Sequence, residues 1–181
     1  MRFISLVLVP LVFGVAADAA ADCPDVRLEV KLNKSDSGLM IDAALRNAGK
    51  APIDLMTTGD GSSFGKRNPS LTFTLEPSDV SDVGTCGFIN ALADEDFLTL
   101  KPGERRKLGW VHPPTPGKPG QYTLTVTYKN DPAAPPVGSG APRPPTPAQL
   151  ARVAKTTECK VTSEPLRFSW DGKRATNVHL R

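Results

Sequence analysis

The sequence has few of the residues that most catalytic and metal sites require. It contains only two histidines and three cysteines in 181 residues. No Cys-x-x-Cys pair is present, and His112 and His179 are far in sequence from every cysteine, which disfavours a zinc site. The letters Gly-x-Ser-x-Gly occur once, at residues 61–65, but they lie in a Gly- and Ser-rich loop, and the helix that follows a hydrolase serine turn is missing there. These absences predict a protein that is not an enzyme, with no catalytic residues, no bound metal and no cofactor.

Long runs of one charge and long apolar runs are also scarce. Lys and Arg number 22 against 19 Asp and Glu, which gives a net charge of +3. The longest basic run is residues 105–107 (Arg-Arg-Lys), and such a strip also protects the edge of a sheet from aggregation. A small basic excess predicts no nucleic-acid partner. The one long apolar stretch lies before residue 18, so no membrane span is expected after it.

The first 21 residues have the composition of an export signal. Arg2 precedes an apolar run over residues 3–17, and three alanines occupy residues 19–21. This order of charge, apolar core and small residues is typical of a cleaved signal peptide. The apolar run is shorter than the roughly 20 residues of a membrane span. We therefore predict a cleaved signal at 1–21 and a single secreted or periplasmic domain at 22–181.

Export would place the three cysteines in a compartment where disulfides persist. An odd number leaves one thiol over. The favoured pair is Cys86–Cys159, which would tie two long irregular segments together. The alternative is Cys23–Cys159, because each of these residues precedes a predicted strand and the first and last strands of a sandwich are often neighbours. The chain is expected to be a monomer unless Cys23 pairs between chains.

Alternation of apolar and polar residues is the strongest structural signal, and it is typical of half-buried strands. It occurs at residues 26–32, 39–45, 71–75, 122–128 and 166–170, with shorter segments at 52–56, 98–100 and 108–110 and weak ones at 83–89. Parallel sheets need helices between strands, and the sequence offers almost none. The predicted fold is all-β, an antiparallel β-sandwich of seven to nine strands.

One short helix is predicted inside a proline-rich insertion, residues 131–158. Thr146 can cap its first turn, Pro147 suits the first helical position, and Gln149 completes a capping box. The proline-rich first half of the insertion is expected to be extended on the surface.

Three segments carry turn and strand motifs that occur together in a known group of domains. They read Leu-Arg-Asn-Ala-Gly-Lys-Ala-Pro-Ile at 45–53, Leu-Lys-Pro-Gly-Glu at 100–104 and Pro-Gly-Gln-Tyr-Thr-Leu-Thr-Val at 119–126. The chain resembles bacterial secreted immunoglobulin-like domains, and is similar to the intracellular proteinase inhibitor type and to adhesion- and enzyme-associated modules. The resemblance implies an immunoglobulin-like sandwich, and it implies that the Tyr122 hydroxyl bonds to the backbone upstream of its strand.

Loops on a rigid scaffold are the usual carriers of binding function. The Gly- and Ser-rich loop at 57–68 contains one aromatic residue among polar neighbours, and its candidate binding residues are Asp60, Ser62, Phe64, Lys66 and Arg67. We therefore predict a binding module for an unidentified protein partner. Protease inhibition, implied by the resemblance, is the first alternative, and an enzyme is the second. The acidic loop at 76–96 leaves calcium binding open.

Overall fold

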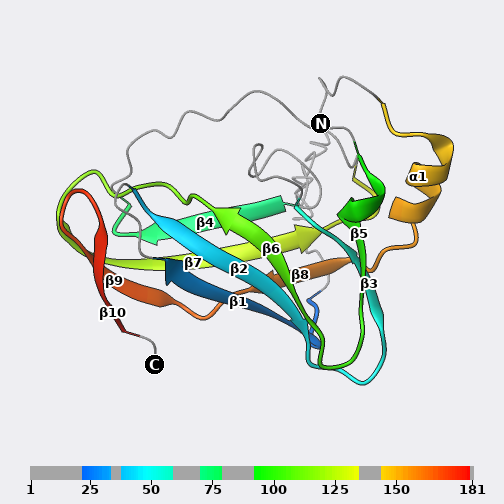
Figure 1. Ribbon diagram of the computed structural model, residues 1–181, viewed down its shortest axis with the longest axis horizontal. Coiled ribbons are helices and arrows are strands. Elements are labelled where there is room, and N and C mark those ends of the chain that lie inside the picture. Colours follow the sequence, from blue (N-terminus) through cyan, green and yellow to red (C-terminus); the bar gives the residue numbers. More distant parts are fainter. Residues whose placement is uncertain (1–21, 34–37, 59–69, 79–91, 135–143, 180–181) are drawn as a thin grey trace, which may run out of the picture.

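The computed structural model describes residues 22–33, 38–58, 70–78, 92–134 and 144–179 (Figure 1). This part of the chain contains ten strands, one short 3₁₀ helix and one α-helix. Every pairing between these strands is antiparallel. The all-β prediction with one helix is confirmed, and the strand count exceeds the expected seven to nine.

The first sheet has three strands in the order β1-β2-β6. They are β1 (Val26–Asn33), β2 (Met40–Asn47) and β6 (Arg105–Val111). The alternation predicted for β1 is present, since Val26 and Leu28 are buried and Arg27 is exposed. β6 is a terminal strand of this sheet, so its basic strip lies at a sheet edge as the protective interpretation requires.

The second sheet is built around one long strand, β7. Its members are β4 (Ser70–Glu76), β7 (Gly120–Asn130), β8 (Cys159–Thr162), β9 (Leu166–Trp170) and β10 (Ala175–His179). β4 pairs with one side of β7, while β9 and β8 share the other side. The apolar residues of both sheets form one buried cluster that includes Ile41, Leu45, Leu124, Tyr128 and Phe168.

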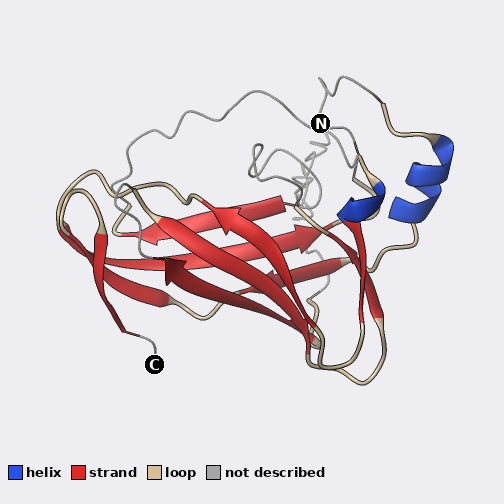
Figure 2. Cartoon of the chain, viewed as in Figure 1, coloured by secondary structure: helices blue, strands red, loops and turns tan. Residues whose placement is uncertain are grey.

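A third, two-stranded sheet lies at one end of the molecule (Figure 2). It consists of β3 (Ile53–Met56) and β5 (Phe97–Leu100), with the 3₁₀ helix η1 (Asp94–Asp96) before β5 and the helix α1 (Pro147–Val153) nearby. Thr146 caps α1 and forms the predicted capping box with Gln149. The helix prediction is therefore confirmed.

A buried asparagine joins the two corners that carry the first two sequence motifs. The Asn47 side-chain amide donates to the carbonyls of Ala51 (2.8 Å) and Leu100 (2.9 Å), and its oxygen accepts from the Gly49 amide (2.8 Å). Gly49 has no room for a side chain, because an added Cβ would lie 2.7 Å from Asp25. Asn47 thus connects the β2–β3 turn with the end of β5.

The turn between β5 and β6 has the geometry that its sequence predicts. Gly103 has a φ of +77°, which the third position of a type II turn requires. The Glu104 amide donates to the Lys101 carbonyl at 2.9 Å. The Glu104 carboxylate in turn accepts from the Lys101 amide, and this hydrogen bond, followed by that from Arg106, lowers the pKa of Glu104 below its ordinary value.

The hydroxyl of Tyr122 donates to the Lys118 carbonyl at 2.9 Å, four residues upstream. The tyrosine hydrogen bond that the resemblance implies is therefore present.

No helix within the described ranges is long and apolar enough to cross a membrane.

The predicted Cys86–Cys159 disulfide was wrong. Cys159 is bonded to Cys23, with their Cα atoms 5.0 Å apart, so the runner-up pairing is the observed one and Cys159 is not available to Cys86. The physical reason is that the chain before β1 lies along β8: Asp22 bridges Lys160, and the Cys23 amide donates to the Lys160 carbonyl at 3.2 Å. Cys86 itself lies outside the described residues.

Candidate functional site

A groove opens between the first strand of one sheet and the last strands of the other. It has a volume of about 780 Å³, which is within the range of ligand sites. Five consecutive residues of β1 (27–31) line one side, and residues of β8, β9 and the segment between them line the other. Figure 1 shows β1 and β8 lying along the same side of the molecule. We call this space the β1–β8 groove.

The groove has an apolar floor and a polar rim. Leu28 and Leu166 are buried at its base, and Val30 and Val161 are half-buried beside them. The rim on the β1 side carries the exposed cations Arg27 and Lys31 together with Glu29, whereas the opposite rim carries Thr162, Glu164 and Pro165. Such a floor suits the side chains of an extended apolar segment.

The backbone of β1 directs unused hydrogen-bonding groups into this groove. The Asp25 carbonyl accepts from the Ala48 amide at 2.7 Å, and this pair continues the register in which Val26 lies opposite Asn47. Alternate residues of an antiparallel ladder point toward the same side. The peptide groups of Leu28 and Val30 therefore point away from β2, and neither makes a backbone hydrogen bond on that side within the described ranges.

The facing edge of β8 follows the same rule. The Ser163 amide donates to the Val126 carbonyl at 2.8 Å, which continues the β7–β8 register. Lys160 and Thr162 consequently point their backbone groups away from β7. The Lys160 carbonyl accepts a hydrogen bond from the Cys23 amide, so this edge already binds a short extended segment of its own chain. The Cys23–Cys159 disulfide fixes this segment to the start of β8.

The structure does not describe the binding loop that the sequence predicts. Asp60, Ser62, Phe64, Lys66 and Arg67 all lie outside the described residues, as do the weak strand signals at 83–89. The expectation for that loop stays a prediction.

The acidic segment at 76–96 is described only at its two ends, residues 76–78 and 92–96. The Asp96 carboxylate accepts hydrogen bonds from the Ala93 amide (2.9 Å) and the Thr57 hydroxyl (3.3 Å), and Asp94 pairs with Arg152 at 2.5 Å. Two of the carboxylates considered for calcium therefore have structural partners. No group of three or more His, Cys, Asp or Glu side chains is arranged to hold a metal ion in the part of the chain that the structure describes.

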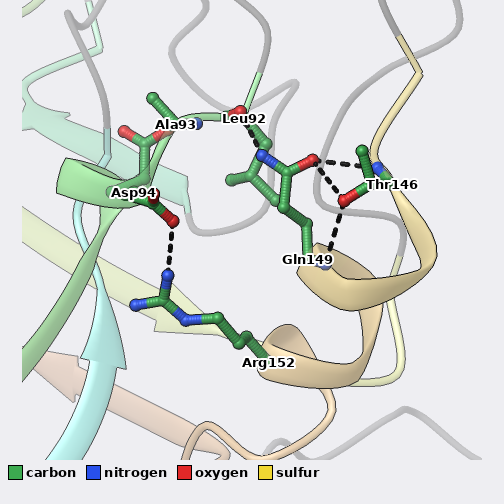
Figure 3. Close-up of polar contacts among 7 residues, drawn as sticks. Leu92, Ala93, Asp94, Thr146, Gln149 and Arg152 are labelled. Atoms are coloured by element: carbon green, nitrogen blue, oxygen red, sulfur yellow. Dashed lines mark hydrogen bonds and ion pairs between the residues drawn. The ribbon is translucent and has the colours of Figure 1, made fainter.

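Side-chain contacts hold α1, the helix of the proline-rich insertion, against the segment that precedes β5. Figure 3 shows the Gln149 amide donating to the Leu92 carbonyl (2.7 Å) while its oxygen accepts from Thr146, and it shows Arg152 reaching Asp94. The Arg152 guanidinium also lies 4.0 Å from the centre of the Phe97 ring. A small cavity of about 180 Å³ lies between this helix and the β3–β5 sheet. These contacts dock the helix beside the β3–β5 sheet.

The most strongly perturbed acid in the described residues is structural. Burial raises the pKa of the Tyr128 hydroxyl far above its ordinary value, and that hydroxyl donates to the Met56 carbonyl at 2.7 Å. Tyr128 therefore stays protonated and fixes β3 against β7.

No protein-family model and no curated protein matches this sequence.

The groove residues on β1, β8 and β9 were not predicted from the sequence. The apolar alternation of 26–32 predicts a strand, but it does not say that, among the described residues, no strand pairs with one side of it. The only available signal was the pair of cations, Arg27 and Lys31, on a short first strand, since charged residues are common on sheet edges.

Proposed function

We propose that this protein is an exported, noncatalytic binding module that holds an extended peptide segment as an added strand on β1. The observation that carries the proposal is the pair of outward-facing peptide units at Leu28 and Val30, which line a groove with an apolar floor. Strand addition uses main-chain hydrogen bonds for affinity and pockets under alternate side chains for specificity. The β1–β8 groove offers both.

The chemistry of the groove favours a polypeptide over a small molecule. A peptide strand on β1 would exchange hydrogen bonds with Leu28 and Val30, and its inward side chains would contact the floor formed by Leu28, Val30, Val161 and Leu166. Its outward side chains would continue the solvent face of the β1-β2-β6 sheet. The free edge of β1 is thereby covered, which removes the hazard of pairing with unrelated chains.

The scaffold in this proposal is an immunoglobulin-like β-sandwich. The antiparallel sheets, the shared core and the Tyr122 bond support it. Export is supported by the Cys23–Cys159 disulfide, because such bonds persist in oxidising compartments. Inhibition of a protease by loop insertion, the alternative that the resemblance implies, depends on segments outside the described residues, so strand binding is preferred.

Selection from a displayed library of random peptides tests the proposal. We expect enriched peptides with apolar residues at alternate positions. We expect Val30→Pro to weaken their binding at least tenfold, because proline removes the amide that faces the groove. Val30→Ala is the matched comparison, since it also removes the branched side chain from the floor but keeps the amide, and it should weaken binding clearly less than Val30→Pro does.

Melting temperatures of both variants are measured beside binding, so that a loss of binding is not confused with unfolding. Enriched peptides that bind the Val30→Pro and Val30→Ala variants equally well would overturn the proposal, as would a library that yields no binder. Inhibition of a protease that survives Val30→Pro would instead favour the inhibitor alternative and would also overturn strand addition.

A further inference from the structure

We infer that the segment held on β1 alternates acidic and apolar residues, in the order acidic–apolar–neutral–apolar–acidic. This inference rests on the proposed strand addition and specifies its partner. It follows from the charges on the outer face of the β1-β2-β6 sheet, which would become the neighbours of an added strand.

Three arginines form one row across that face. Arg27 lies directly opposite Arg46, and Arg46 lies directly opposite Arg105. Like charges in directly opposed positions destabilise a sheet. Glu29 compensates part of this row, since its carboxylate lies 2.7 Å from Arg105 and 3.8 Å from Arg46. Glu29 therefore neutralises the Arg46 and Arg105 members of the row, and it forms no ion pair with Arg27 within the described ranges.

Arg27 is the outer end of the row and the member that an added strand would meet. It is exposed, lies on the rim of the groove and forms no ion pair within the described ranges. A residue placed directly opposite Arg27 on a fourth strand would occupy the same face at the spacing of adjacent strands, about 4.8 Å. A carboxylate there would supply the counter-charge that the row lacks, and arginine binds carboxylates through two parallel hydrogen bonds.

Lys31 repeats the arrangement four residues along β1. Its side chain is exposed on the same face, and although Asp42 lies opposite it, the two form no ion pair in the described part of the chain. Glu29 stands between the two cations, so a third acid at the central position would meet a like charge. The positions opposite Leu28 and Val30 point toward the apolar floor. Because this pattern reads the same in both directions, it holds for a parallel and for an antiparallel added strand.

Three peptides that differ only in charge test the inference on the intact protein. Their central residues are Glu-Val-Thr-Val-Glu, Gln-Val-Thr-Val-Gln and Lys-Val-Thr-Val-Lys, in one common flanking sequence. We expect the acidic peptide to bind about threefold more tightly than the glutamine peptide and about tenfold more tightly than the lysine peptide, because opposite charges in directly opposed positions of neighbouring strands attract and like charges repel. The preference should shrink as salt rises.

The Arg27→Glu variant should remove the preference for the acidic over the lysine peptide, because each peptide then meets one opposite charge and one like charge on β1. Lys107→Gln is the matched control, because Lys107 is an exposed cation on β6, away from the β1 edge, and it should leave that preference unchanged. Equal binding of all three peptides, still lost in Val30→Pro, would overturn the charge pattern and leave strand addition standing. Binding that is indifferent to Val30→Pro, or self-association of the chain through β1 in place of peptide binding, would overturn both.

Discussion

Replacing Asn47 with alanine lowers the free energy of unfolding by about 3–5 kcal/mol, because each buried group left without its hydrogen bond costs about 1–3 kcal/mol. Three such bonds are lost at once. They join the Asn47 side chain to the carbonyls of Ala51 and Leu100 and to the amide of Gly49. The Asn47 side chain and its hydrogen bond to the Leu100 carbonyl are buried, so water cannot replace that partner, while the groups at Ala51 and Gly49 are partly buried. The loss is a large fraction of the 5–15 kcal/mol that stabilises a typical domain.

Urea unfolding of Asn47→Ala and Asn47→Asp separates hydrogen bonding from packing. Asparagine and aspartate have nearly the same shape, but aspartate cannot donate to the two carbonyls. We therefore expect Asn47→Asp to be at least as destabilising as Asn47→Ala. Asn33→Ala, at the end of β1, is the control and should cost less than 1 kcal/mol. A loss below 1 kcal/mol for Asn47→Ala would show that this corner does not hold the two turns together.

Removing the Cys23–Cys159 disulfide lowers the free energy of unfolding by about 3–5 kcal/mol. The bond joins residues 136 positions apart, and a loop of that length corresponds to about 5 kcal/mol when the effect is assigned to the entropy of the unfolded chain. The Cys23→Ser and Cys159→Ser variants should unfold at the same denaturant concentration as each other. Adding reductant to the unmodified protein should bring it to that same concentration.

Cys86→Ser is the matched control for this prediction. Because the bond joins the other two cysteines, Cys86→Ser should keep both its unfolding midpoint and its sensitivity to reductant. Thiol titration of the unfolded, unreduced protein should find one reactive thiol of the three cysteines. A Cys86→Ser variant that unfolds like the reduced protein would restore the pairing that the sequence favoured and contradict the structure.

The sequence predicts well those parts of the fold that depend on residues close together in the chain. Alternation identifies β1, β2 and β7 because side chains of a strand point to opposite faces. The Thr-Pro-Ala-Gln order identifies the start of α1, and Pro-Gly identifies the turn at Gly103. Each of these signals lies within a few residues of the structure it specifies. None required knowledge of which strands become neighbours.

The missed features all depend on contacts between distant segments. β8 is four residues long and reads Cys-Lys-Val-Thr, which is too short for a clear alternation. It forms because β7, with 11 residues, extends beyond β9 and offers its last four residues as a partner. The disulfide was misassigned for a related reason, since the contact between Cys23 and β8 arises only when the chain before β1 lies along that strand.

The groove was missed because an open edge is a property of the whole sheet. The alternation at 26–32 predicts a half-buried strand, and the side chains of Leu28 and Val30 are indeed buried or half-buried. Their peptide groups gain a role only because no strand of the described chain pairs with that side of β1. The binding loop at 60–67 was chosen from its composition, and the structure does not describe it.

Hydrogen exchange of single backbone amides, with and without the selected peptide, tests strand addition on β1 most directly. Strand addition predicts that the amides of Leu28 and Val30 exchange at least tenfold more slowly when the peptide is bound. The amides of Arg27 and Glu29 already face β2 and should be unchanged, so protection should alternate along the strand. Peptide binding that leaves the exchange of Leu28 and Val30 unaltered, or that protects another strand edge instead, would contradict the account.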